Sequence, residues 1–142
     1  MSRFSARVEY ACLAALELAL HYQSGRTVQV KTITARHHIP RGFLVQILRE
    51  LKNAGLVQSV RGSSGGYHLA RPPAEISVWD IVQAVQGGER RERTTIEQSP
   101  LAPVFQGLWQ QLDHQEEQLL RRTTLEKLVK KLPSELEPMY YI

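Results

Sequence analysis

The chain contains few residues that could serve as metal or redox ligands. Cys12 is the single cysteine among 142 residues, which excludes an intramolecular disulfide and a thiolate-ligated metal cluster built from one chain. The five histidines include no pair at i and i+4, the spacing that places two ligands on one helix face. We therefore expect no metal site and no cofactor. Because Cys12 lies on the apolar side of a predicted helix, a buried inert thiol is favoured over a redox sensor.

Long apolar runs are also missing. No segment approaches the roughly 18 apolar residues that a membrane span requires, and residues 1–7 contain no apolar signal-peptide core. These absences predict a cytoplasmic protein with no membrane partner. Ser63 and Ser64 have no recognisable base, and the glycines from Gly62 to Gly66 lack the Lys-Ser/Thr of a phosphate loop. No catalytic arrangement is recognisable, so we do not expect an enzyme.

Acidic residues are scarce in the first half of the chain. Residues 1–72 hold 10 Lys/Arg and 3 Asp/Glu, whereas residues 73–142 hold 8 and 11. The basic first half is typical of a surface that faces a polyanion. A basic surface that is merely solvated gives the same charge count, so the motifs must decide between the two.

Apolar periodicity predicts three helices in the first half, over residues 4–22, 30–37 and 40–54. A turn at His38-Ile39-Pro40 separates the second from the third. The third helix has a predicted buried stripe and an opposite polar face. We interpret it as a candidate recognition helix, whose outward residues are Arg41, Gly42, Val45, Gln46, Arg49, Glu50 and Lys52.

A β-hairpin follows the three helices. Residues 56–60 alternate as a strand, residues 61–66 form a glycine-rich turn, and residues 67–69 return as the second strand. Ser77 and Asp80 then form a capping box for a fourth helix. The predicted fold is mainly α with a small β-hairpin, a winged helix-turn-helix domain over residues 1–86 followed by a long dimerisation helix.

Eight residues of the predicted recognition helix and hairpin are the candidates for DNA binding. On the helix, Gln46 suits adenine, Arg49 suits guanine or phosphate, and Val45 suits a thymine methyl group. A solvated side chain or a phosphate contact is the alternative for each residue. In the hairpin, Arg61 beside small residues suits a narrow groove, with an ordinary glycine turn as the alternative. The full set is Arg41, Phe43, Val45, Gln46, Arg49, Ser59, Arg61 and Gly62.

The second half is expected to mediate dimerisation. A polar loop over residues 87–100 precedes a helix over 101–122, and Thr123 with Glu126 predicts a capping box for a helix over 125–132. The long helix carries an apolar stripe that monomers rarely expose, although packing on its own domain is the alternative. A two-fold dimer predicts a near-palindromic operator. The stripe consists of Val104, Phe105, Leu108, Trp109 and Leu112.

The chain resembles the bacterial winged-helix regulators typified by IscR, NsrR and CymR. The resemblance rests on Tyr10, Leu44, Gln46, Leu51, Asn53-Ala54-Gly55-Leu56-Val57, Ser59-Val60-Arg61-Gly62 and Gly65-Gly66-Tyr67. It implies a dimeric transcription regulator, expected to be a repressor, that binds double-stranded DNA. Members with an iron-sulfur cluster carry three cysteines in the loop equivalent to residues 87–100. This loop contains neither Cys nor His, which argues against a cluster.

The tail over residues 133–142 carries the last resemblance. The cluster-free member CymR regulates cysteine metabolism, and its tail is similar to the Tyr140-Tyr141-Ile142 end of this chain. Such tails look like the peptide that serine acetyltransferase inserts into cysteine synthase. The resemblance implies regulation of cysteine or sulfur metabolism genes. The alternatives are an interaction module that regulates cysteine synthase through Tyr140, Tyr141 and Ile142, and a tail that packs on its own dimer.

Overall fold

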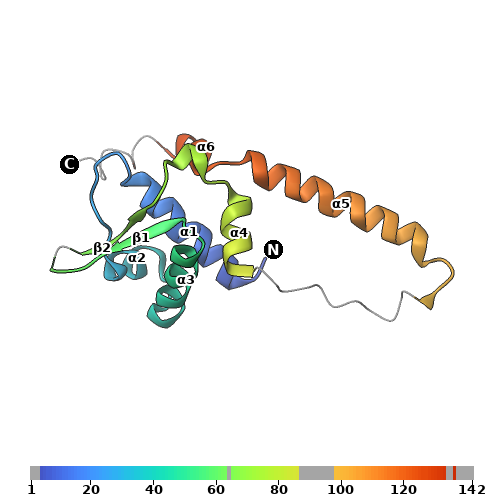
Figure 1. Ribbon diagram of the computed structural model, residues 1–142, viewed down its shortest axis with the longest axis horizontal. Coiled ribbons are helices and arrows are strands. Elements are labelled where there is room, and N and C mark those ends of the chain that lie inside the picture. Colours follow the sequence, from blue (N-terminus) through green and yellow to red (C-terminus); the bar gives the residue numbers. More distant parts are fainter. Residues whose placement is uncertain (1–3, 64, 87–97, 134–135, 137–142) are drawn as a thin grey trace.

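The computed structural model describes residues 4–63, 65–86, 98–133 and 136. Most helices pack around the first one, and the long helix α5 projects from this body (Figure 1). A two-stranded antiparallel hairpin extends on the other side. The predicted fold class, mainly α with a small hairpin, is confirmed. The elements are α1 (Ala6–Leu20), α2 (Val30–His37), α3 (Arg41–Asn53), β1 (Val57–Val60), β2 (Gly66–Leu69), the 3-10 turn η1 (Pro73–Glu75), α4 (Val78–Gln86), α5 (Ala102–Arg122) and α6 (Leu125–Lys130).

Helix α1 forms the centre of the core because small side chains on it allow other helices to approach closely. Its buried residues include Ala11, Ala14 and Ala15, and α1 contacts α3, α4 and α6. The Ser5 side chain accepts a hydrogen bond from the Val8 backbone N–H and so caps the helix. The helix is therefore shorter than the predicted range of 4–22, and Tyr22 lies outside it.

The helix-turn-helix has the predicted order, α2 has the predicted bounds, and α3 is one residue shorter than predicted at each end. Helix α2 ends at His37, and His38 adopts a left-handed conformation with φ 54°, which reverses the chain direction. Ile39 is buried in the turn, and Pro40 flanks the start of α3, where its missing N–H has no helical partner to lose. Leu44, Ile47, Leu48 and Leu51 of α3 enter the core.

The capping box predicted for α4 is confirmed. The Ser77 backbone N–H donates to Asp80 Oδ2 at 3.0 Å, and the Asp80 N–H donates to Ser77 Oγ at 3.2 Å. This reciprocal pair satisfies two backbone donors that no helical carbonyl can reach.

The capping prediction for α6 is wrong by one residue. Thr124 caps this helix by accepting a hydrogen bond from the Lys127 N–H at 3.2 Å, whereas Thr123 donates its hydroxyl to the Leu119 carbonyl of α5. The backbone of Thr124 is extended and forms an antiparallel bridge with Ser77. The helix ends at Lys130, two residues before the predicted end at Leu132.

Helix α5 contacts the body at the end nearer α4 and α6 (Figure 1). There the Arg121 guanidinium lies over the Trp79 ring at 5.1 Å from its centroid, a favourable cation–π distance. Among the described residues, none of the helices combines the length and apolarity of a membrane-spanning segment. Residues 87–97, which hold most of the predicted polar loop, lie outside the described residues.

Candidate nucleic-acid interface

Helix α3 presents the predicted recognition residues on its outer surface. Arg41, Gln46 and Arg49 are exposed, while Val45 is half-buried. Phe43 is 50% exposed, a large value for an aromatic side chain in the middle of a basic surface. Because the opposite face of α3 is fully buried, the helix cannot rotate without opening the core. The exposed face of α3 is therefore held in one orientation.

Two side chains of α1 support the flank of α3. The Tyr10 and Phe43 rings lie with their centroids 6.2 Å apart and their planes at 57°, a tilted arrangement that aromatic pairs favour. One turn earlier on α1, Arg7 forms an ion pair with Glu50. The prediction that Glu50 points outward with the recognition residues is wrong, because this partner holds it half-buried. The ion pair also neutralises a carboxylate that would otherwise repel a polyanion.

The hairpin, which we call the wing (residues 57–69), follows α3 directly. Ser59 pairs with Tyr67 in the antiparallel register, and its hydroxyl accepts a hydrogen bond from Lys52 Nζ of α3 at 2.8 Å. Arg61 and Gly62 lie exposed where the turn begins. Gly62 has a φ of 110°, a conformation that favours glycine, and its carbonyl accepts from the Gly65 N–H at 3.0 Å. Ser64 lies outside the described residues.

A short extended segment between α1 and α2, which was not predicted from the sequence, anchors the wing. Val28 and Tyr67 exchange two backbone hydrogen bonds, of 2.8 and 2.9 Å. Gln29 Nε2 also donates to the Ser63 carbonyl in the turn, at 3.3 Å. The alternation of Thr27, Val28 and Gln29 is the sequence signal that could have indicated a third extended segment. The anchor joins the wing to the start of α2.

The electrostatics of this half of the chain are dominated by cations. Of the acidic residues in the described part before residue 73, Glu17 is buried and Glu50 is paired with Arg7, which leaves Glu9 as the exposed carboxylate there. A surface of this kind attracts the phosphate backbone of nucleic acids. The exposed basic residues are Arg26, Lys31, Arg36, Arg41, Arg49, Lys52, Arg61 and Arg71.

Helix α5 carries a second exposed surface, which is apolar. The Phe105 and Trp109 rings stack with centroids 6.2 Å apart and planes at 27°, and Val104 is 74% exposed. The predicted alternative, packing of this stripe on its own domain, is not the arrangement of the described residues. The five predicted dimerisation residues, Val104, Phe105, Leu108, Trp109 and Leu112, are all exposed.

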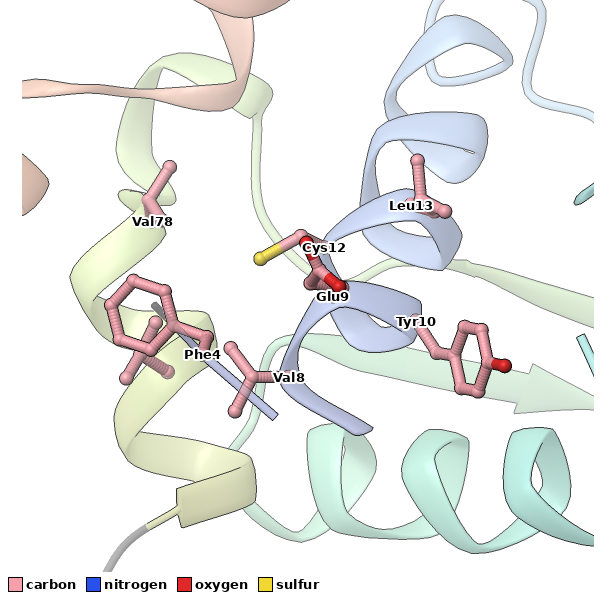
Figure 2. Close-up of a pocket in the computed structure, with 8 residues that line it drawn as sticks. Phe4, Val8, Glu9, Tyr10, Cys12, Leu13 and Val78 are labelled. Carbon is pink, nitrogen blue, oxygen red and sulfur yellow. The ribbon is translucent and has the colours of Figure 1, made fainter. Parts of the chain in front are cut away.

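Cys12 lines an apolar cavity of about 390 Å³ between α1 and α4. Figure 2 shows its sulfur directed toward Val78 and Phe4, while Tyr10 points to the other side of α1. Burial, with a smaller contribution from the Glu9 carboxylate, raises the pKa of the thiol to about 11. The thiol is therefore protonated and unreactive near neutral pH, which agrees with the expectation of an inert cysteine.

The described residues offer no cluster of three or more His, Cys, Asp or Glu side chains arranged to hold a metal ion. A thiolate-ligated iron-sulfur cluster requires several cysteines, and Cys12 is the single one in the chain. Such a cluster therefore does not fit these residues. The predicted tail residues Tyr140, Tyr141 and Ile142 lie outside the described residues.

Known proteins share this arrangement. CymR of Bacillus subtilis (strain 168), an HTH-type transcriptional regulator, is 30% identical over 141 residues, which cover 99% of each chain. The solved structure of CymR, the global cysteine regulator of B. subtilis, superposes with a TM-score of 0.80 at 28% identity, covering 94% of this chain and 100% of that one. The structure of T. potens IscR superposes with a TM-score of 0.76 at 30% identity, covering 99% and 97%.

The Rrf2 family model, described as an iron-dependent transcriptional regulator, matches residues 4–131. The iron dependence in this description does not fit the possible ligands of this chain, because Cys12 is its single cysteine. The family and these relatives are transcription regulators rather than enzymes. Because the match spans the helix-turn-helix, the wing and α5, the chain belongs to the Rrf2 family and is a DNA-binding transcription regulator with a winged-helix fold.

Proposed function

We propose that this protein is a homodimeric, cluster-free repressor that binds a near-palindromic operator through α3 and the wing. The observation that carries the proposal is the joint between the two elements. Lys52 of α3 donates to Ser59 of the wing at 2.8 Å, and Leu51 of α3 and Val57 of the wing are buried in the same core. The exposed arginines of both elements therefore lie on one surface. Helix α3 enters the major groove, and the wing reaches the adjacent backbone or minor groove.

The side chains along this surface match different parts of a duplex. Gln46 and Arg49 have the donor groups that read adenine and guanine edges. Arg61 beside Gly62 suits a narrow minor groove, because the neighbouring glycine has no side chain to obstruct the approach and the groove concentrates negative potential. Arg41, at the start of α3, is placed to contact phosphate. Phe43 and Val45 supply apolar contacts for a thymine methyl group.

The apolar stripe on α5 supports the dimer. Exposed apolar patches of this kind mark interaction sites, and an isologous contact between two α5 helices covers the stripe of both copies at once. At about 1.5 Å per residue, the 21 residues of α5 span roughly 32 Å. A two-fold dimer presents its α3 helices to half-sites separated by roughly 34 Å or a small multiple of it.

The regulated genes and the location follow from similarity rather than geometry. We infer that the targets belong to cysteine or sulfur metabolism. This inference is supported by the likeness to CymR over 99% of the chain, because CymR is the global cysteine regulator of B. subtilis. As a DNA-binding regulator of a bacterial family, the protein is proposed to act in the cytoplasm. Repression is the mode of regulation that we propose.

Selection of bound fragments from genomic DNA tests the proposal. The purified protein, mixed with sheared DNA of its source, is expected to retain fragments that share a near-palindromic sequence upstream of sulfur metabolism genes. The control is the same selection with an Arg49→Ala/Arg61→Ala variant, which keeps the fold and removes two exposed cations. Recovery of the same unspecific fragments by both proteins would contradict the proposal.

The tail hypothesis has its own test. Deletion of residues 139–142 removes Tyr140, Tyr141 and Ile142 without touching the described core. If the tail binds cysteine synthase, co-sedimentation with that enzyme is lost while affinity for the selected DNA fragment in the absence of the enzyme is retained. Unchanged binding of both would leave only local packing of the tail.

A further inference from the structure

A buried carboxylate lies behind the helix-turn-helix, away from the residues proposed to touch DNA. Glu17 of α1 has a side chain with 0% exposure, and it is the one charged residue among the buried residues of the described chain. Removing a carboxylate from water is unfavourable unless partners replace the lost hydrogen bonds. The partners of Glu17 therefore indicate what the group does.

Three basic groups surround the Glu17 carboxylate. His21, one turn later on α1, places Nε2 at 3.0 Å from Oε2. His37, in the last turn of α2, places Nε2 at 2.8 Å from Oε1, and Arg36 Nε of the same turn lies 3.4 Å from Oε1. Two of the three partners thus come from the end of α2, so the carboxylate joins two helices.

The geometry also determines which ring nitrogens carry protons. A carboxylate oxygen only accepts hydrogen bonds. His21 and His37 each face it with Nε2, so each ring must carry a hydrogen on Nε2 in order to donate. This requirement holds whether the rings are neutral or protonated, and it gives the arrangement a spectroscopic signature.

The contact between Glu17 of α1 and the end of α2 lies directly before the turn to α3. His38, with its left-handed backbone, follows Arg36 and His37, and α3 begins at Arg41 three residues further on. We propose that Glu17 is a positioning residue for DNA recognition: by holding the last turn of α2 through His37 and Arg36, it sets the angle at which α3 is presented to the duplex. This inference rests on the proposed function, since α3 must be the DNA-reading helix.

Glu17→Gln tests the proposal because the amide keeps the volume of the carboxylate and replaces one acceptor by a donor. The control is Glu126→Gln, an exposed glutamate of α6 that pairs with Lys130. Operator affinity is measured with the duplex recovered in the genomic selection. Glu17→Gln is expected to weaken it by about tenfold, in line with a positioning rather than a contacting role, while Glu126→Gln leaves it unchanged.

A pair of substitutions at His37 separates positioning from general stability. In His37→Gln the amide N–H can replace the imidazole donor, whereas His37→Leu leaves Oε1 without that donor. His37→Gln is expected to retain most of the affinity and His37→Leu to lose it to the same degree as Glu17→Gln. Equal affinities for the two His37 variants would overturn the proposal.

Two further measurements do not depend on DNA. Long-range nitrogen–hydrogen NMR correlations are expected to show a proton on Nε2 of both rings in the wild type, and loss of that pattern at one ring in Glu17→Gln. Amide exchange is expected to accelerate mainly in the last turn of α2 and the following turn. Faster exchange spread evenly over all helices would reduce Glu17 to a stability role and overturn the proposal. If the wild type binds no duplex, the proposed function fails, while these two measurements still test whether Glu17 holds the end of α2.

Discussion

Val28 and Tyr67 exchange a pair of backbone hydrogen bonds, of 2.8 and 2.9 Å, across a loop and a strand far apart in the sequence. This pair makes β2 the middle one of three extended segments, with β1 on its other side. The wing is therefore attached to the helix-turn-helix at its base, and this attachment fixes the orientation of the wing relative to α2 and α3.

Gly66 makes this close approach possible. A Cβ atom at Gly66 would lie 2.4 Å from the Val28 carbonyl oxygen, far inside van der Waals contact. Gly66→Ala must therefore separate the wing from the loop, and we expect it to lower the free energy of unfolding by about 1–3 kcal/mol. Thermal unfolding followed by circular dichroism measures the loss.

Gly42→Ala is the matched control for this substitution. Gly42 lies in α3, where an added Cβ atom would have no neighbour within 4 Å, and alanine favours a helix over glycine by up to about 1 kcal/mol. We expect its melting temperature to equal or exceed that of the wild type. Equal melting temperatures for the Gly66→Ala variant and the wild type would show that the anchor is not tight.

Trp109→Glu is expected to convert the dimer to monomers. The charge would be buried without a partner in the proposed α5 interface, and losses of about 2 kcal/mol or more are typical of aromatic hot spots, so the dimer dissociation constant should rise at least about thirtyfold. Gln110→Glu adds the same charge on the side of α5 away from the stripe and should leave the dimer intact. Analytical ultracentrifugation distinguishes the two. A dimer unaffected by Trp109→Glu would place the interface elsewhere.

Cys12 should resist alkylation near neutral pH. With its pKa raised from 9.0 to about 11, fewer than about one thiol in a thousand is ionised there, and only the thiolate reacts. The rate of reaction with iodoacetamide should rise steadily with pH up to about 11 in the folded protein, and mass spectrometry follows it. A rate that levels off below pH 9 would mean that the thiol is activated.

The same shift has a consequence for stability. In the unfolded chain the thiol loses its proton near pH 9.0, whereas in the folded chain it keeps the proton to about pH 11. The unfolded state therefore binds fewer protons between these values, and the free energy of unfolding contributed by this group falls as the pH rises through that window. Cys12→Ala should remove this part of the pH dependence in chemical denaturation.

Local sequence patterns predicted the helices and strands. The environments of individual side chains depended on partners far away in the sequence, which local patterns do not show. The apolar spacing of Leu44, Ile47 and Leu51 was sufficient to place α3, because a buried stripe repeats along one helix. Glu50 was expected to face outward on the same spacing, but its environment depends on Arg7, 43 positions earlier. The pairing of Val28 with Tyr67 likewise joins remote segments, and no local motif predicts it.

Glu17 was missed for a related reason. A glutamate one turn before His21 is typical of an exposed pair on a helix surface. Glu17 is buried because α2 packs against it and brings His37 into contact with its carboxylate. The roles of Arg41, Phe43, Val45, Gln46, Arg49, Ser59, Arg61 and Gly62 in DNA binding remain predictions, although the structure places them on α3 and the wing.

The most direct test of the central claim, that α3 and the wing bind DNA as one surface, is the affinity of Arg61→Ala for the selected duplex over a range of salt concentrations. We expect a loss of about 1–3 kcal/mol and a salt slope smaller by about one, while Lys131→Ala, an exposed cation in the second half of the chain, changes neither. The dimer should be unaffected. Affinity and salt slope equal to those of the wild type would contradict the assignment of the wing to DNA.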